Sequence, residues 1–391
     1  MRFPEFTEEW EETTLGKISE ITKGSGISKD QLSEQGSPCI LYGELYTKYK
    51  SEIIDEVYSR TELDSSSLVK SKANDVIIPC SGETAIDIST ARCVPFNNIL
   101  LGGDLNIIRL KHDDGGFFAY QLNGARKKDI ARVAQGVSVV HLYGENLKHI
   151  RVYHPAIEEQ KKITRLLSLI DERIATQNKI IEDLKKLKSA ISKHLFTRKD
   201  LLETTICLSE IATLRNGYAF QSSKYNALGK WKILTITNVS GERHINDEDC
   251  NCIINLPDDI QDHQVLKEGD ILISLTGNVG RVSLCKDGDY LLNQRVGLLQ
   301  LAKNVNQEFL YQILSSQKFE NSMIACGQGA AQMNIGKGDV ESYVLPYSSN
   351  GNNILWIAKI LHSYDECIIN EQRRLTLLTM QKQYLLTQMF I

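Results

Sequence analysis

Few residues in this chain have the types and the spacing that catalysis requires. Thr276–Gly280 is rich in glycine, but it lacks the lysine of a Gly-x-x-x-x-Gly-Lys-Ser/Thr phosphate loop. Pro79-Cys80 has the form of a cytosine-methyltransferase nucleophile, yet no cofactor loop and no Glu-Asn-Val sequence accompany it, so a buried cysteine at a strand end is the favoured interpretation. Pro257-Asp258 begins like a nuclease motif, but no Asp/Glu-x-Lys follows it. Because an Asn-Pro-Pro-Tyr motif is also absent, the sequence predicts a protein that is not an enzyme and has no catalytic residue.

The candidate metal ligands do not form a motif. Cys250 and Cys252 have a Cys-x-Cys spacing, and His244 and His263 lie near them in the sequence. A structural zinc site needs a second pair of ligands at a comparable spacing, and the sequence offers none. We therefore expect no metal and no other cofactor in this chain.

Other residues have types that suit contacts with DNA. Gly24-Ser25-Gly26 and Asn216–Gln221 combine a flexible backbone with polar and aromatic groups, and 135–141 and 328–337 offer amides and hydroxyls. An arginine can form two hydrogen bonds to guanine, although each candidate can also be an ordinary turn or surface residue. The candidate DNA-binding residues are Lys23, Ser25, Tyr42, Arg92, Gln135, Ser138, His141, Asn216, Tyr218, Phe220, Thr276, Asn278, Arg281, Arg295, Gln328, Gln332, Asn334 and Lys337.

The elements that position these residues are written twice in the chain. Ile18–Ile21 returns as Leu208–Ile211, and Asp75–Ile78 returns as Asp270–Ile273. Gln135-Gly136 also returns, so three matches occur in the same order at offsets of 190 to 195 residues. This period is too long for a solenoid and indicates a duplicated domain.

Each copy has the same order of elements. It begins with short apolar stretches between turn residues, which predict strands, and it closes with a long segment that predicts a helix. We divide the chain into a first head (1–155), a central helical spacer (156–200), a second head (201–345) and a C-terminal helical spacer (346–391).

The closing segments, from about 156 to 199 and from about 354 to 391, carry apolar residues at alternating spacings of four and three. Eight of ten such positions are apolar in each segment, and the two polar positions fall at the same steps, which indicates a coiled-coil seam. The residues expected to pair the helices are Ile170, Ile174, Gln177, Ile181, Leu184, Lys188, Ile191, Leu195, Tyr364, Ile368, Glu371, Leu375, Leu378, Lys382, Leu385 and Met389.

Charge favours antiparallel pairing of the two helices. Parallel pairing would place Lys188 against Lys382. One antiparallel register instead places Lys188 against Glu371 and Gln177 against Lys382, although the equal spacing of the repeat guarantees that some such register exists, so the match permits this register without proving it. The alternative is that each helix packs only on its own head.

Two similar heads on antiparallel helices are related by a pseudo-two-fold axis, as are the strands of duplex DNA. Such a protein can read two half-sites separated by a spacer whose length the helices fix. The heads resemble each other weakly outside the framework positions, which favours two different half-sites over a palindrome. The alternative is a protein–protein scaffold with two ligand-binding heads and no role on DNA.

The composition limits the class of protein. The 391 residues are 42% hydrophobic and 24% charged, which is typical of a soluble globular protein with several cores. No run of 18 apolar residues occurs, so no transmembrane helix is predicted. Met1–Phe6 lacks the apolar core of a signal peptide, and the nine cysteines are scattered, so we expect reduced thiols in the cytoplasm.

The net charge of −4 is unevenly distributed along the chain. Residues 1–155 carry −4 and residues 201–345 carry −5, whereas 156–200 carry +4 and 346–391 carry +1. Because affinity for DNA depends on neutralising phosphates, acidic heads predict weak binding by the chain alone.

A further ordered set of sequences consists of Arg2–Phe6 with Trp10, Leu15–Ile18, Pro155–Ile163 with Leu166, Leu167 and Asp171, and Gln328–Ile335 with Leu345-Pro346. With this set the chain resembles, along essentially its whole length, the specificity subunit of type I restriction–modification systems. The second copy departs from the family pattern between Pro346 and Ile357, where it is three residues longer and lacks the Glu-Gln pair.

The resemblance implies an α+β fold with two target-recognition domains joined by two long antiparallel helices. It implies a non-catalytic subunit that reads a bipartite, asymmetric site in double-stranded DNA. It also implies recruitment of two adenine-methyltransferase subunits and two ATP-dependent restriction and translocase subunits. S-adenosylmethionine, ATP and Mg²⁺ would then belong to these partners, which would also supply much of the grip on phosphates.

Overall fold

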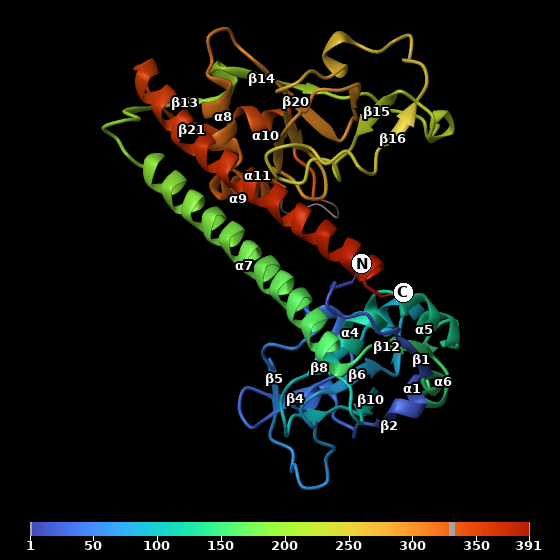
Figure 1. Cartoon of the computed structure of the whole chain (residues 1–391). Helices are drawn as coiled ribbons and strands as arrows, with labels where there is room; N and C mark the ends of the chain where they lie inside the picture. The colour runs from blue at the N-terminus through green and yellow to red at the C-terminus, as the bar shows by residue number, and fades with distance from the viewer. Residues whose placement is uncertain (1, 328–332, 391) are drawn as a thin grey trace. The chain divides into compact units, whose positions relative to one another are not determined.

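The computed structural model describes residues 2–327 and 333–390 (Figure 1). The chain forms two compact units, Met1–Lys179 with Arg373–Ile391 (unit 1) and Ile180–Gln372 (unit 2). Each unit combines one head with parts of two long helices, α7 (Ile157–Leu195) and α11 (Gly351–Gln388). The four segments expected from the sequence follow one another along the chain. The compact units differ from them, because unit 1 contains both the first part of the chain and Arg373–Ile391. No helix in the described part of the chain has the length and apolar character needed to cross a membrane.

The first head consists of short strands and helices. Its strands are β1 (Glu11–Thr14), β2 (Ser19–Lys23), β3 (Leu32–Ser33), β4 (Ser37–Ile40), β5 (Ser59–Thr61), β6 (Asp75–Pro79), β7 (Ser81–Gly82), β8 (Arg92–Val94), β9 (Leu100–Leu101), β10 (Leu105–Leu110), β11 (Val140–His141) and β12 (Arg151–His154). Its helices are α1 (Leu15–Ile18), η1 (Lys29–Gln31), α2 (Glu44–Thr47), α3 (Ala85–Ile88), α4 (Gly115–Asn123), α5 (Lys127–Val133) and α6 (Gly144–Lys148).

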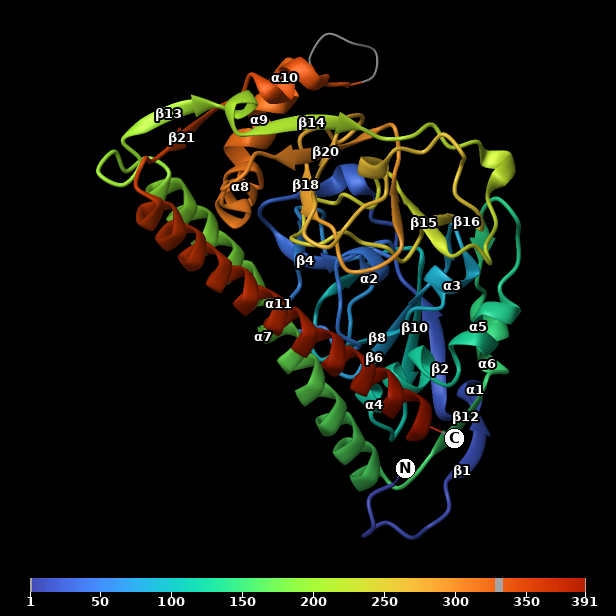
Figure 2. The same cartoon turned by 90° about the horizontal axis from the view of Figure 1, so that it is seen from above.

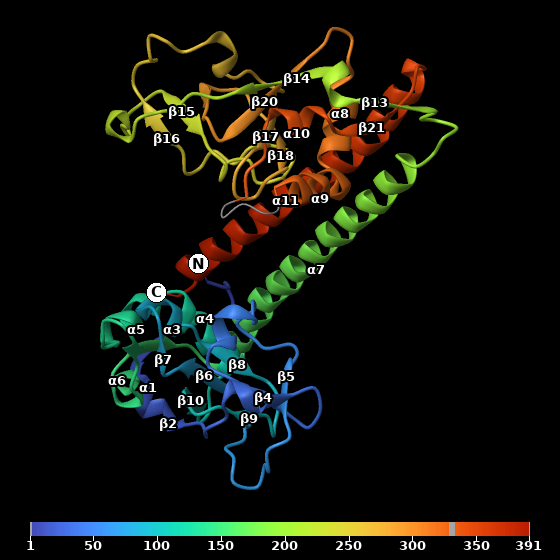
Figure 3. The same ribbon diagram turned by 180° about the vertical axis from the view of Figure 1, so that it is seen from behind.

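An antiparallel sheet with the strand order β2-β10-β6-β8 is the centre of this head (Figure 3). Successive side chains of a strand point to opposite faces, and both faces of β6 are buried. Val76 and Ile78 belong to a core with Phe117 of α4, whereas Ile77 belongs to a separate core with Ile40 of β4. The uninterrupted apolar run of β6 is therefore explained by a helix on one face and a second sheet, β3-β5-β4-β9, on the other.

The second head repeats the main elements of the first in the same order, with fewer short strands. Its strands are β13 (Thr204–Cys207), β14 (Ala212–Asn216), β15 (Trp231–Leu234), β16 (Asn251–Ile253), β17 (Ile271–Ser274), β18 (Val282–Leu284), β19 (Tyr290–Leu292), β20 (Val296–Leu301) and β21 (Val344–Tyr347). Its helices are η2 (Leu208–Glu210), η3 (Ser222–Lys224), η4 (Asp262–Gln264), α8 (Gln307–Leu314), α9 (Gln317–Cys326) and α10 (Lys337–Glu341).

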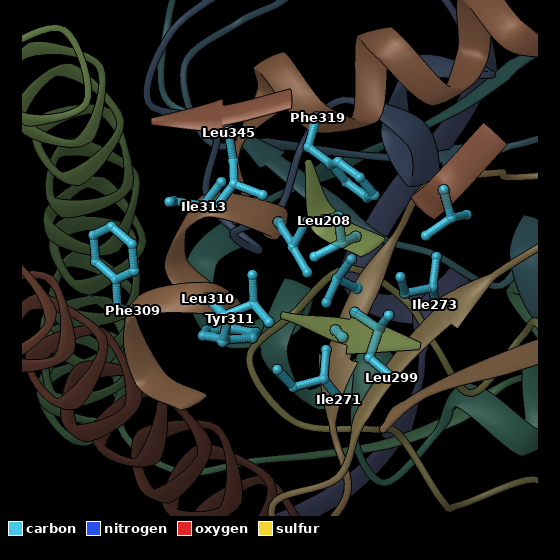
Figure 4. Packing of buried hydrophobic residues seen from close by; sticks show 14 of the residues in the cluster. Leu208, Ile271, Ile273, Leu299, Phe309, Leu310, Tyr311, Ile313, Phe319 and Leu345 are labelled. Atoms are coloured by element: carbon cyan, nitrogen blue, oxygen red, sulfur yellow. The ribbon is translucent and has the colours of Figure 1, made fainter. Parts of the chain in front are cut away.

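The central sheet of the second head has the equivalent strand order β14-β20-β17-β18. In Figure 2 helices α8 and α9 lie toward one side of this sheet, and strands β15 and β16 lie toward the other. Ile271 and Ile273 face the helices, together with Phe309 and Phe319 (Figure 4), whereas Leu272 belongs to the core on the opposite face. The duplication inferred from the sequence is thus a duplication of the fold.

A glycine at the end of the first sheet strand repeats for a steric reason. A Cβ atom on Gly24 would lie 1.9 Å from the carbonyl oxygen of Gly102, and one on Gly217 would lie 2.2 Å from that of Asn293. Both backbones pass so close to a neighbouring segment that only glycine fits.

The long helices run antiparallel within each unit. In unit 1 Ile163 and Leu167, near the start of α7, belong to one core with Leu385 and Met389, near the end of α11. In unit 2 the order is reversed, because Leu195 at the end of α7 shares a core with residues near the start of α11. All sixteen residues expected to pair the helices are buried or half-buried. The predicted seam is therefore the buried face of both helices.

The final residues of each helical segment complete the core of a head. In unit 1 the ring of Phe390 lies 5.2 Å from that of Phe117 and 6.4 Å from that of Trp10, centroid to centroid. In unit 2 the ring of Phe196 lies 6.3 Å from that of Phe309. The first head thus includes residues from the end of the chain in its core.

Candidate functional site

A closed hairpin presents several of the candidate DNA-binding residues of the first head. The amide of Gln135 donates to the carbonyl of His141 at 2.9 Å, and the amide of His141 donates back to Gln135 at 2.7 Å. Gly136 adopts a φ of 116°, which favours glycine. Strand β11 at the end of the hairpin pairs with β7, so the exposed side chains of Gln135, Ser138 and His141 project from a fixed backbone.

The second head brings its candidates together at the equivalent position. Thr276 and Asn334 form a β-bridge, and the Thr276 hydroxyl donates to the Asn334 side-chain oxygen at 3.2 Å. Asn278 is exposed in the turn that follows β17, and Lys337 is exposed at the start of α10, where it pairs with Glu341. The candidates Gln328 and Gln332 lie outside the described residues.

Three candidates of the first head lie at the end of β2 or just before α2 in the sequence. Lys23 is exposed at the end of β2. Ser25 has a structural role, because its hydroxyl accepts a hydrogen bond from the amide of Val69 at 2.8 Å. Tyr42 is half-buried and packs against the core that contains Ile40.

The loop after β14 holds three candidates of the second head. The backbone carbonyl of Asn216 contacts His263 at 3.1 Å, and its side chain is exposed. The Tyr218 hydroxyl donates to Asp259 at 2.7 Å, and its ring lies 4.9 Å from that of Phe220. These two aromatic rings are half-buried, so part of each is accessible.

The three candidate arginines differ in accessibility. Arg295 is exposed, and Arg281 is partly exposed and pairs with Glu320 at 3.5 Å. Arg92 is only 7% exposed, and its guanidinium donates to the carbonyls of Leu45 and Tyr49 within the first head. The prediction that Arg92 contacts guanine is contradicted by this burial, because the guanidinium is already bonded inside the protein.

Cys80 is also buried, at 7% exposure. Burial raises the pKa of its thiol to about 11, so the thiolate needed for nucleophilic attack is disfavoured.

A buried ionic cluster joins the helices to the first head. Lys382 of α11 donates to Glu52 at 2.5 Å and pairs with Asp171 of α7 at 2.6 Å, and the Tyr120 hydroxyl donates to Asp171 at 2.7 Å. Burial raises the pKa of Glu52, although the nearby charges of Lys382 and Arg92 act in the opposite direction. We call Glu52, Arg92, Asp171 and Lys382 the first clasp.

An equivalent cluster joins the helices to the second head. Lys188 of α7 donates to Asp365 of α11 at 2.6 Å, and Gln312 donates to the same carboxylate at 2.6 Å. Arg243 donates to Asp365 at 2.9 Å and makes two hydrogen bonds to Glu308, at 2.9 and 2.6 Å. Burial acts to lower the pKa of Arg243, but the bonds to Glu308 and the acidic charges outweigh it and raise that pKa. We call Lys188, Arg243, Glu308 and Asp365 the second clasp.

The clasps correct the expected helix register. Lys188 bonds to Asp365 rather than to the expected Glu371, which is almost two helical turns further along α11. Lys382 likewise bonds to Asp171 instead of facing Gln177. The expected register is therefore wrong, and the antiparallel direction is retained.

The head residues of the clasps have no signal in the sequence. Glu52 and Arg243 occupy equivalent positions, because the residue after each forms a parallel bridge to β8 or to β18. Their charges are opposite, so a search for repeated residue types passes over them. Asp171 and Asp365 do occupy repeated positions of the two helical segments, and this repeat is the sequence signal that could have located the clasps.

Comparison with known proteins identifies relatives that match most of the chain. The family model described as the type I restriction modification DNA specificity domain matches residues 7–186 and 203–380. The type I restriction enzyme MjaVIII specificity subunit of Methanocaldococcus jannaschii is 25% identical over 345 residues, which cover 81% of this chain and 77% of that protein.

Solved structures share the fold at low sequence identity. The S subunit of a type I restriction-modification system from M. genitalium superposes with a TM-score of 0.63 at 18% identity, covering 98% of this chain and 96% of that one. A second structure is described as the structural basis of complex assembly and conformational transition of the type I R-M system. A chain of that structure superposes with a TM-score of 0.59 at 15% identity, with 97% of each chain covered.

Proposed function

The chain belongs to the family of type I restriction–modification DNA specificity subunits, which are not catalytic, and from this membership we propose that it reads a bipartite, asymmetric DNA site. Residues 1–155 and 201–345 each read one half-site, and the helical segments 156–200 and 346–391 set the spacer between them. The matched family is one of DNA specificity, which does not favour a scaffold without a role on DNA.

The observation that carries this proposal is a repeated framework with different side chains at its exposed loops. Both heads have the same order of strands in the central sheet. In the first head β7, which follows β6, pairs with β11, and in the second Thr276, which follows β17, pairs with Asn334. At this position the first head exposes Gln135 and His141, and the second exposes Asn334 and, at the start of α10, Lys337. Since base edges are distinguished by such donors and acceptors, the two heads read different sequences.

We assign catalysis to partner subunits that assemble in the cytoplasm. Two methyltransferase subunits use S-adenosylmethionine, and two restriction and translocase subunits use ATP and Mg²⁺. The acidic heads support this division, because a net charge of −4 or −5 disfavours close approach of phosphates without added cations.

Mapping of adenine methylation across the genome tests the proposal in cells with and without this chain. We expect one bipartite motif to lose methylation when the chain is absent, and an unchanged methylation map in cells that express the complex would reject the proposal. The purified chain alone should bind its site poorly until a methyltransferase subunit is added. Sequence-selective binding by the chain alone at nanomolar concentration would contradict the role of partners.

A further inference from the structure

The hairpin of the first head exposes two aliphatic side chains that its fold does not use. Val137 is 96% exposed and Val139 is 53% exposed. Both valines lie in the bend between the bridged residues Gln135 and His141, so one short loop presents both apolar side chains. Val137 has buried almost none of its surface on folding, and its methyl groups are accessible to a partner.

This loop stands on a narrow and fixed support. Two backbone hydrogen bonds close the hairpin between Gln135 and His141, and β11 fixes it to β7. The major groove of B-DNA accepts a two-stranded β-ribbon, and the side chains of such a ribbon reach the base edges. A loop that is closed by one bridged pair of residues is no wider than such a ribbon, so the groove accepts it.

The charge of the segment supports contact with DNA. Residues 130–144 contain no Asp or Glu, although the first head has a net charge of −4. Residues 321–338, the corresponding stretch of the second repeat, also contain no Asp or Glu. Both repeats thus keep carboxylates out of the same stretch, as close approach to phosphates requires.

Resting on the proposed function, we propose that Val137 reads a thymine of the first half-site through the 5-methyl group of that base. The thymine methyl is the apolar group on a base-pair edge in the major groove, and aliphatic side chains recognise it by contact. Gln135, Ser138 and His141 flank Val137 and supply the hydrogen-bonding groups for adjacent atoms. Val137 is then a specificity-determining residue of the first head.

The test uses the complex of the full chain with its methyltransferase subunits and a duplex that carries the mapped bipartite site. Each thymine is replaced in turn by deoxyuridine, which removes only the 5-methyl group. For the wild-type complex we expect one replacement, in one half-site, to weaken binding about fourfold, which corresponds to the burial of one methyl-sized group. For V137A the same replacement should have no effect, because the contact is already lost.

Two comparisons separate this proposal from its alternatives. L228A is the matched control, because Leu228 is 90% exposed in the second head, and it should leave the deoxyuridine effect at the Val137-dependent thymine unchanged. If V137A weakens assembly with the methyltransferase, or binds worse by the same factor with thymine and with deoxyuridine, the valine contacts a protein or a backbone and the proposal is overturned. The proposal is also overturned if the wild-type complex binds its bipartite site but binds every deoxyuridine duplex as tightly as the unsubstituted duplex. A complex that selects no bipartite site at all rejects instead the proposed function.

Discussion

The two clasps have the same residue types on the long helices, but the residue of the head that bonds to them is acidic in the first clasp and basic in the second. Each contains a lysine from one long helix and an aspartate from the other, at positions repeated along the chain. The first head adds Glu52, whose charge is offset by the nearby Arg92, whereas the second head adds Arg243, whose charge is offset by Glu308. Each cluster therefore contains two positive and two negative groups.

This difference shows which part of the interface was free to diverge. The lysine and aspartate belong to both helices, and a change in either would leave a charge without its partner in the other helix. The third and fourth charges lie within one head, so that head can exchange an acid for a base if a second residue restores the balance. Arg92 adds a positive charge near Glu52 and Asp171, and its buried guanidinium donates to the carbonyls of Leu45 and Tyr49 instead of reaching solvent.

Replacing Lys382 with methionine should have the largest effect, because it leaves Glu52 and Asp171 close together without a cation between them. Both carboxylates are less than a tenth exposed, and we expect unit 1 to lose about 3–5 kcal/mol. Hydrogen exchange of peptides from β6 and β17 reports the opening of units 1 and 2 separately. The control K186M removes a lysine that is 68% exposed, and it should cost less than about 1 kcal/mol. Equal losses in the two variants would show that the first clasp does not stabilise unit 1.

The corresponding K188M substitution should cost less. Asp365 retains the guanidinium of Arg243 and the amide of Gln312, so no buried carboxylate is left unpaired. We expect unit 2 to lose about 1–2 kcal/mol in the same exchange measurement. A loss as large as that of K382M would mean that the bonds of Arg243 and Gln312 to Asp365 do not compensate for the missing lysine.

A double-mutant cycle sharpens the comparison by testing the register. K188M and D365L should show a coupling of about 1–2 kcal/mol in the stability of unit 2, because each removes the partner of the other. K188M and E371L should be additive within about 0.5 kcal/mol, because Glu371 lies about 9 Å further along the helix than Asp365. Coupling to Glu371 instead would restore the register expected from the sequence.

The smallest expected effect is the contribution of His154 to the pH dependence of unit 1. His154 contacts Asp113 at 3.0 Å, and the hydrogen bond to this carboxylate raises the pKa of His154 above its ordinary value of 6.5. The resulting stabilisation is complete below pH 6.5 and is lost as the pH rises through the raised pKa. The second repeat has Tyr347 at the equivalent strand position, so H154Y should flatten the pH dependence of unit 1 by less than about 1 kcal/mol and leave unit 2 unchanged. A wild-type unit 1 that becomes more stable between pH 6.5 and 9 would contradict this sign.

The sequence predicts the framework better than the contacts that fix it. The repeats locate both heads, and the spacing of Ile163, Leu167 and Ile170 identifies the buried face of α7. The register escapes prediction because a regular apolar repeat fits several registers almost equally well. The choice among them depends on Glu52 and Arg243, which are distant in sequence from both helices.

The candidate site follows the same rule. Gln135, Ser138 and His141 are polar residues in a turn-rich stretch, and their exposure agrees with that composition. The burial of Arg92 depends on carbonyls of a segment more than forty residues away, which no local pattern reveals.

The position of Phe390 against Trp10 and Phe117 has a consequence for biosynthesis. The first head is synthesised before the second, but its core includes Phe390, which is translated after the whole second head. At about 5–20 residues per second, the ribosome needs on the order of ten seconds or more to add the intervening chain. During that interval the nascent first head exposes the apolar surface that Phe390 later covers, so its core closes only after Phe390 has left the ribosome.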